Sequence, residues 1–209
     1  MSKVQRPSVV VFDLGKVLVD FDYSIAARKI ASRGKMLAEK IHEFIALSPL
    51  LFKYETGLIT REQFFSAVCQ ATGYRGDIEE FGGFFADIFT PITPMVALQE
   101  SLRKGQIPTY IFSNTNDLAI THIRQNFPFF SNFDGYILSY EVGSMKPDTK
   151  VYEALEKMAG KRGPDILYLD DRLENVEAGA ARGWQVILQE TPEKTLAAIQ
   201  KFGLLNGQK

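Results

Sequence analysis

The chain has 209 residues, with 24 Lys and Arg against 25 Asp and Glu, a net charge of -1 and 45% hydrophobic residues. This composition excludes a disordered chain, and the balanced charge excludes the basic footprint that nucleic-acid binding requires. The single cysteine, Cys69, excludes an intrachain disulfide, and no apolar run reaches the ~20 residues of a membrane span. We therefore expect a cytoplasmic protein without a nucleic-acid or membrane partner. The oligomeric state stays open.

Short apolar runs alternate with helical patterns along most of the chain. Runs rich in β-branched residues are typical of strands buried on both faces, and helices between them indicate βαβ units. Strands are predicted at 8–12, 107–112, 135–139, 166–169 and 185–188, and helices near 115–126, 148–159, 172–182 and 192–202. The sequence therefore predicts an α/β fold, with a three-layer, Rossmann-like core and a mostly parallel sheet.

Residues 21–95 interrupt this alternation. They contain helical patterns at 24–33, 36–46 and 61–72 and no convincing strand, and Pro91 and Pro94 mark their end. We interpret this stretch as a helical insertion. The predicted core domain is therefore 1–20 together with 96–209, and the predicted insertion is 21–95.

Polar residues follow the predicted strands, at the sheet edge where open α/β folds bind ligands. They are Asp13, Ser113, Asn114, Lys146, Asp170 and Asp171. The adjacent acids, with a third carboxylate from another strand, would repel one another unless a cation lay between them. Oxygen ligands in small number favour Mg²⁺, and a lysine near a hydroxyl and backbone amides suits a phosphoryl group.

Each of these residues also has a simpler interpretation, in which it only stabilises the fold. Asp171 and Glu174 would form a capping box, and Ser113 or Asn114 would cap the following helix. Asp13 would bond nearby amides in a turn, and Lys146 would be solvated. Capping explains only one acid of the adjacent pair, so the pair favours the metal site.

Four segments, in order, resemble the motifs of the haloacid dehalogenase (HAD) superfamily. They are Phe12-Asp13-Leu14-Gly15-Lys16-Val17, Phe112-Ser113-Asn114, Lys146-Pro147-Asp148, and Leu169-Asp170-Asp171 with Asn175. The insertion lies where subfamily I of this superfamily has a helical cap of the C1 type. The Asp-Leu-Gly motif and the paired acids most resemble the bacterial α-D-glucose-1-phosphate phosphatase-like group.

This resemblance implies a Mg²⁺-dependent phosphatase acting on a small phosphorylated metabolite, such as a sugar phosphate, through an aspartyl-phosphate. It implies that Asp13 is the nucleophile and that Lys146 neutralises the transferring group, which Ser113 and the Asn114 amide hold. The implied Mg²⁺ ligands are Asp13, the Gly15 carbonyl and Asp171, with Asp170 supporting or sharing the ion.

Gly15 departs from the family pattern. Most phosphatases of the superfamily carry there a second Asp, which serves as general acid and base, a role worth roughly 10²–10⁴-fold. Either the substrate has a leaving group that needs little protonation, as an anomeric phosphate does, or Asp20 or Asp22 substitutes. Capping of the next helix is the simpler role for those two acids.

Two other functions remain open. The missing acid favours a catalytically weak protein that binds phosphorylated ligands or a partner. A 2-haloacid dehalogenase needs no leaving-group acid. Those relatives, however, usually have an aromatic residue at the position of Gly15, and they lack the paired metal-binding acids. The presence of Asp170 and Asp171 therefore counts against this alternative.

The insertion itself offers one candidate segment for substrate contact, with three side chains. Lys53, Tyr54 and Glu55 lie next to Gly57, in a segment where polar side chains and a flexible residue meet. Surface salt bridges or solvated positions are the simpler interpretation of these side chains.

Overall fold

Five parallel strands form the central sheet, in the order β5–β4–β1–β6–β7. They are β1 (Val9–Phe12), β4 (Thr109–Ser113), β5 (Gly135–Leu138), β6 (Ile166–Asp170) and β7 (Gln185–Leu188). The structure is a computed structural model that describes residues 5–205. The register pairs Phe12 with both Ile111 and Leu169, so the carboxyl ends of β1, β4 and β6 meet at one edge.

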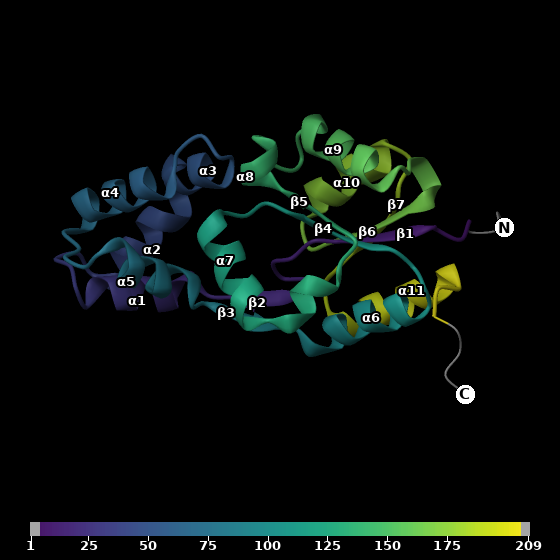
Figure 1. The fold of residues 1–209 in the computed structure, drawn as a ribbon, viewed down its shortest axis with the longest axis horizontal. Helices are drawn as coiled ribbons and strands as arrows, with labels where there is room; N and C mark the ends of the chain where they lie inside the picture. The colour runs from purple at the N-terminus through teal and green to yellow at the C-terminus, as the bar shows by residue number, and fades with distance from the viewer. Residues whose placement is uncertain (1–4, 206–209) are drawn as a thin grey trace.

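Helices cover both faces of the sheet (Figure 1). One layer contains α6 (Thr93–Lys104), α7 (Asp117–Asn126) and α11 (Pro192–Ile199), and the other contains α9 (Thr149–Ala159) and α10 (Leu173–Ala181). Successive residues of β1 face opposite layers, because side chains alternate along a strand. Val10 and Phe12 join the apolar cluster of the first layer, and Val9 and Val11 join that of the second. The predicted three-layer α/β core is confirmed.

The predicted strands all form, within about two residues of their expected ends. Helix α6 was not predicted, because Pro94 was interpreted as the end of the insertion. In the structure Pro94 lies in the first turn of α6, where its missing N–H removes no helical hydrogen bond. Short elements complete the core: α8 (Ser139–Val142) and the 3₁₀ helices Pro128–Asn132, Gly163–Asp165 and Gln200–Phe202.

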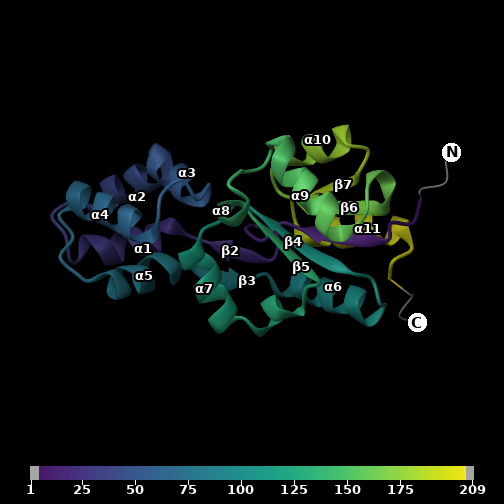
Figure 2. The same cartoon turned by 45° about the horizontal axis from the view of Figure 1, so that its top comes forward.

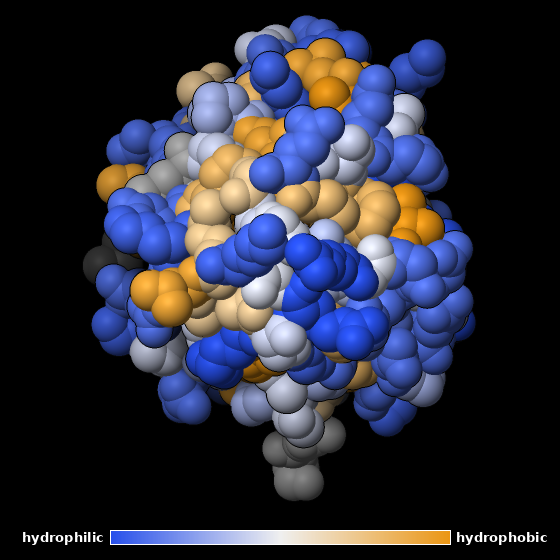
Figure 3. All heavy atoms as spheres, turned by 90° about the vertical axis from the view of Figure 1, so that its left-hand side faces the viewer, coloured by the Kyte–Doolittle hydropathy of each residue, from blue (hydrophilic) through white to orange (hydrophobic). Residues whose placement is uncertain are grey.

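The insertion, which we call the cap, contains the helices α1 to α5 and lies beside the carboxyl edge of the sheet (Figures 1 and 2). They are α1 (Tyr23–Ala31), α2 (Ala38–Leu47), α3 (Pro49–Glu55), α4 (Arg61–Thr72) and α5 (Ile78–Ala86). Their core is largely aromatic, and Phe64 packs against Tyr54, Phe81 and Phe85. Seen from its outer end, this cap shows apolar side chains scattered among hydrophilic ones (Figure 3). In the described residues, no helix combines the length and apolarity needed to cross a bilayer.

Two short strands join the cap to the core. β2 (Val19–Phe21) pairs antiparallel with β3 (Phe89–Pro91). The expectation of no strand in residues 21–95 is therefore wrong at its end. The chain enters and leaves the cap side by side, and backbone pairing satisfies the polar groups of both crossings. The predicted domain boundaries lie at this two-stranded ribbon or just beyond it, and the division stays a prediction.

Candidate active site

Three carboxylates meet at the edge of the sheet where β1 and β6 end. Each of Asp13, Asp170 and Asp171 offers an oxygen within 4.8 Å of the others. Asp13 is the first residue after β1, and Asp170 is the last residue of β6. The sequence places these acids more than 150 positions apart, and the adjacent parallel strands bring them together.

Lys146 lies between two of these acids. Its Nζ is 3.0 Å from Asp13 Oδ1 and 2.6 Å from Asp170 Oδ2, and it donates to the Phe112 carbonyl at 2.8 Å. The side chain is 1% exposed, so the interpretation of Lys146 as a solvated residue is wrong. Burial alone would lower the pKa of Lys146, but the charges of Asp13 and Asp170 outweigh it and raise this pKa. The lysine is therefore held as a cation.

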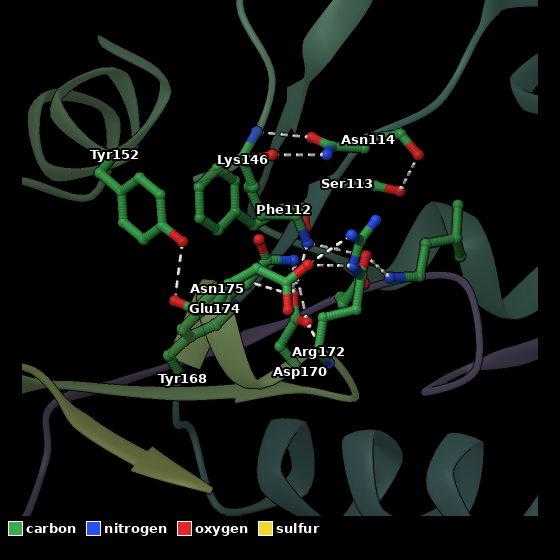
Figure 4. Close-up of polar contacts among 12 residues, drawn as sticks. Phe112, Ser113, Asn114, Lys146, Tyr152, Tyr168, Asp170, Arg172, Glu174 and Asn175 are labelled. Carbon is green, nitrogen blue, oxygen red and sulfur yellow. Dashed lines mark hydrogen bonds and ion pairs between the residues drawn. The ribbon is translucent and has the colours of Figure 1, made fainter. Parts of the chain in front are cut away.

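Asp170 is fully buried and surrounded by donors (Figure 4). Its oxygens accept from Lys146, from the Tyr168 hydroxyl, from the Arg172 backbone N–H at 2.8 Å, and from Asn175 Nδ2 at 3.1 and 3.2 Å. Burial raises the pKa of Asp170, but Lys146 and the hydrogen bonds hold it below its usual value. Because these donors use both oxygens of the carboxylate, Asp170 is held in place and can in turn position Lys146.

The Tyr168 hydroxyl was not predicted as part of the site. Tyr168 was interpreted only as an apolar residue of a strand. Because side chains two apart in a strand share a face, its position relative to Asp170 was the available signal. The structure places both side chains on the same side, where the hydroxyl donates to the carboxylate.

Lys146 does not balance the negative charge that gathers around Asp13. Burial is the main cause that raises the pKa of Asp13 to about 8; Lys146 opposes it, and Asp170 and Asp171 add to it. Burial and the charge of Asp170 also raise the pKa of Asp171. One lysine does not neutralise three carboxylates, so the donor set fits a small divalent cation with oxygen ligands.

The capping interpretation of Asp171 is wrong. Helix α10 has Arg172 as its N-cap residue, with no side-chain cap hydrogen bond. Glu174 accepts instead from Arg172 Nε at 2.8 Å. Asp171 is therefore half-buried beside the other acids without the local role that a capping box would give it.

Ser113 and Asn114 do not cap a helix either. The N-cap residue of α7 is Asn116, whose Oδ1 accepts from the Ala119 N–H at 3.0 Å. The Asn114 side chain bridges to the Lys146 backbone, accepting from its N–H at 2.8 Å and donating to its carbonyl at 3.0 Å. This reciprocal pair fixes the Lys146 segment against the end of β4. Ser113 is buried next to it.

Of Asp20 and Asp22, only Asp22 has the capping role expected of both. Asp22 accepts from the Ser24 N–H at 2.8 Å as the N-cap of α1, as predicted. Asp20 forms an exposed ion pair with Lys16. Both carboxylates have other partners, and neither belongs to the cluster of Asp13, Asp170 and Asp171. A substitute acid is therefore to be sought among other residues.

A side chain at Gly15 would collide with an aromatic ring. A Cβ at this position would lie 2.9 Å from Phe21 Cε1. The Phe21 ring is itself packed edge-on against Tyr23 and Phe89, with centroids 5.5 and 6.1 Å away. The position that carries an Asp in most phosphatases of the superfamily is therefore filled by Phe21.

A small cavity of about 60 Å³ lies between the core and the cap. The core contributes Leu14, Gly15, Ser113, Asn114, Thr115, Asn116, Ala119 and Ile123, and the other side contributes Phe21, Tyr23, Glu55 and Phe89. Of the three cap candidates, only Glu55 reaches this cavity. Lys53 is exposed, and the Tyr54 hydroxyl donates to Asp117 of α7. Metabolite pockets are usually several times larger, so the cap is close against the core here.

Comparison with known proteins assigns the family. Residues 7–183 match the family model of haloacid dehalogenase-like hydrolases. The chain belongs to this family. The resemblance drawn from the four motifs is thus confirmed at the level of the HAD-like hydrolases, and the narrower glucose-1-phosphate phosphatase-like group stays a prediction.

This HAD-like hydrolase is similar to both phosphatases and dehalogenases. It is 22% identical to D-ribitol-5-phosphate phosphatase of Bacteroides thetaiotaomicron, over 87% of this chain and 91% of that protein. It is 24% identical to an (S)-2-haloacid dehalogenase of Pseudomonas putida, over 85% and 82%. A HAD family enzyme of B. thetaiotaomicron, solved with magnesium and inorganic phosphate, has the same fold, with a TM-score of 0.77, 23% identity and coverage of 87% and 93%.

Proposed function

We propose that this hydrolase is a Mg²⁺-dependent phosphatase of a small phosphorylated metabolite, such as a sugar phosphate, acting through an aspartyl-phosphate. The observation that carries the proposal is the meeting of Asp13, Asp170 and Asp171 around Lys146, beside a cavity lined by Ser113. Asp13, Asp171 and the Gly15 carbonyl would hold Mg²⁺, with Asp170 supporting them. The ion would supply positive charge for the phosphoryl oxygens.

Asp13 is the nucleophile in this proposal. Its Oδ1 accepts from the Leu14 N–H at 2.6 Å and lies 3.0 Å from Lys146 Nζ, so both donors fix one oxygen. We assign attack on phosphorus to Oδ2. The Ser113 hydroxyl and the backbone N–H of Asn114 hold the transferring group, and Lys146 stabilises its charge. Phosphoryl transfer depends mostly on such positioning and electrostatics.

The dehalogenase relatives define the main alternative. A dehalogenase also uses an Asp nucleophile, but it gains nothing from a third carboxylate that lacks a capping role. Asp171, half-buried beside Asp13, therefore supports the phosphatase. The second alternative, a phosphate-binding protein with weak catalysis, rests on the absence of an acid at Gly15.

A panel assay separates these functions. Phosphorylated metabolites, including D-ribitol 5-phosphate and glucose 1-phosphate, are scored for phosphate release with Mg²⁺ and with EDTA, alongside 2-haloacids scored for halide release. We expect phosphate release that needs Mg²⁺ and that Asp13→Asn abolishes. Halide release in EDTA would establish the dehalogenase instead, and binding without turnover of any phosphate ester would establish the binding protein.

A further inference from the structure

Glu55, the last residue of α3, is the one carboxylate that the cap contributes to the lining of the cavity. The cavity also contains Gly15, the position without an acid, and Ser113, which we assign to phosphoryl binding. A carboxyl group from the cap thus lines the same cavity as Ser113 and Asn114, and Leu14 and Gly15 bring this cavity next to Asp13 along the chain.

The segment around Glu55 is fixed to the core on both sides. The Ser139 hydroxyl of α8 donates to the Glu55 carbonyl at 2.5 Å. On one side, the Tyr54 hydroxyl donates to Asp117, which also pairs with Arg61. On the other, Gly57 has a φ of +72° and packs so closely on the Tyr140 carbonyl that a Cβ would overlap it. These contacts set the position of the Glu55 backbone.

The Glu55 carboxyl has the proton affinity that acid–base catalysis needs near neutral pH. Burial raises its pKa to about 7, while the Asn116 side-chain amide and the charge of Arg172 act to lower it. Tyr23 also lines this cavity, and its pKa is raised by burial and then by the charge of Glu55. A carboxyl group with such a pKa both donates and accepts a proton at physiological pH.

We propose that Glu55 is the general acid and base of this hydrolase, in place of the Asp that Gly15 and Phe21 exclude. The assignment rests on the proposed phosphatase function. It also makes cap closure part of the chemistry, because the acid reaches the cavity only when α3 is seated on the core.

Glu55 acts in both halves of the reaction. Asp13 Oδ2 forms a bond to phosphorus as the bond to the leaving oxygen breaks, and the leaving oxygen takes the proton of the Glu55 carboxyl. In the second half, water attacks phosphorus and gives its proton to the Glu55 carboxylate. The Asp13–phosphorus bond breaks with its electron pair returning to Asp13, so phosphate is released and Glu55 is protonated again.

Glu55→Gln tests the assignment, because glutamine keeps the shape and cannot transfer the proton. With Mg²⁺ and 4-nitrophenyl phosphate, whose leaving group needs no proton, we expect a burst of about one nitrophenolate per chain. Steady-state turnover should then fall roughly 10²–10⁴-fold, because water lacks its base. Phenyl phosphate, which has a more basic leaving oxygen, should lose the burst as well. In Glu55→Ala, added formate should restore part of the steady-state rate.

Glu39→Gln is the matched control, since Glu39 is an exposed glutamate of the same cap. It should retain the wild-type rates with both esters. Wild-type turnover that needs Asp13 but is unchanged in Glu55→Gln would overturn the role of Glu55 and leave the phosphatase standing. No Asp13-dependent phosphate release from the wild type would overturn the proposed function, and the role of Glu55 with it. Equal loss of burst and turnover with both esters, without rescue by formate, would reduce Glu55 to a structural residue.

Discussion

Lys146 is the residue on which the charge balance of the site depends. It is the cation within hydrogen-bond distance of both Asp13 and Asp170, and it is buried with them. Buried charges are stable only when they are paired, so removing one partner leaves an uncompensated charge. The cluster is therefore sensitive to this side chain even without substrate.

Lys146→Met should lower the free energy of unfolding by about 3 kcal/mol, because the methionine fills the space but leaves Asp170 unpaired. Urea unfolding in EDTA measures this change. Lys157→Met, at an exposed position of α9, is the control and should stay within about 0.5 kcal/mol of the wild type. Equal changes for Lys146→Met and Lys157→Met would show that the buried ion pairs contribute nothing to the free energy of unfolding.

The buried carboxyl of Glu55 should make the free energy of unfolding depend on pH. Its folded-state pKa, about 7, lies above the 4.5 of a solvated glutamate, so folding takes up a proton at pH values between the two. Relative to Glu55→Gln, the wild type should therefore lose stability as pH rises from about 4.5 to about 7, by up to about 3 kcal/mol, and change no further above that. Urea unfolding of both proteins at pH 5 and pH 8 measures the difference. If the wild type and Glu55→Gln lost the same free energy of unfolding between pH 5 and pH 8, the Glu55 carboxyl would not be buried.

The sequence predicts most of the residues that meet at the candidate site, apart from Tyr168, but it does not predict their local geometry. Position after a buried strand was enough to find Asp13, Ser113 and Asp170. Whether Asp171 caps a helix depends on where α10 begins, and helix ends are the least certain part of a sequence-based prediction. The access of Glu55 to the cavity depends on contacts with α8 that are more than 80 positions away.

Among the elements, the contact between the end of α3 and α8, which we call the α3–α8 seam, positions the cap. Gly57 combines a positive φ with close contact to the Tyr140 carbonyl, so it has two separate reasons to be glycine. Gly160 has a similar φ, +62°, and open space around it. Alanine substitutions at the two positions therefore distinguish the cost of backbone strain, which both share, from the cost of steric overlap, which only Gly57 adds.

Gly57→Ala should destabilise the protein more than Gly160→Ala, which should show only the roughly 1 kcal/mol strain of a left-handed alanine. We also expect Gly57→Ala to lower kcat, because the overlap moves Glu55 off the cavity. Thermal unfolding and steady-state kinetics of the two variants measure both effects. If the two alanines behave alike in both measurements, the seam does not hold Glu55.

The elements that the sequence did not reveal are those whose pattern is short or ambiguous. The strands β2 and β3 have three residues each, too few for a periodic signal, and they form because they pair with each other. Helix α6 was hidden by a proline in its first turn. The buried strands of the main sheet were predicted because continuous β-branched runs are a strong signal.

At the scale of the molecule, a closed cap explains a site that is small and mostly buried. The cavity of about 60 Å³ is lined by both parts, so a substrate must enter while the cap is displaced. The net charge of -1 agrees with binding of a small anion by a local metal ion and Lys146, without a broad basic surface. The parallel sheet and the insertion were predicted at this scale, and so was contact of the cap with the site, but the α8 residues that the cap contacts, Ser139 and Tyr140, were not.

In the proposed reaction, Asp13 carries the phosphoryl group during turnover. The most direct test mixes the wild-type chain with 4-nitrophenyl phosphate and Mg²⁺, quenches in acid within one turnover, and maps the modified peptide by mass spectrometry. We predict one added phosphoryl group on Asp13, lost with EDTA and absent from Asp13→Asn. Phosphate release without such a group, or with the group on another residue, would exclude Asp13 as the nucleophile.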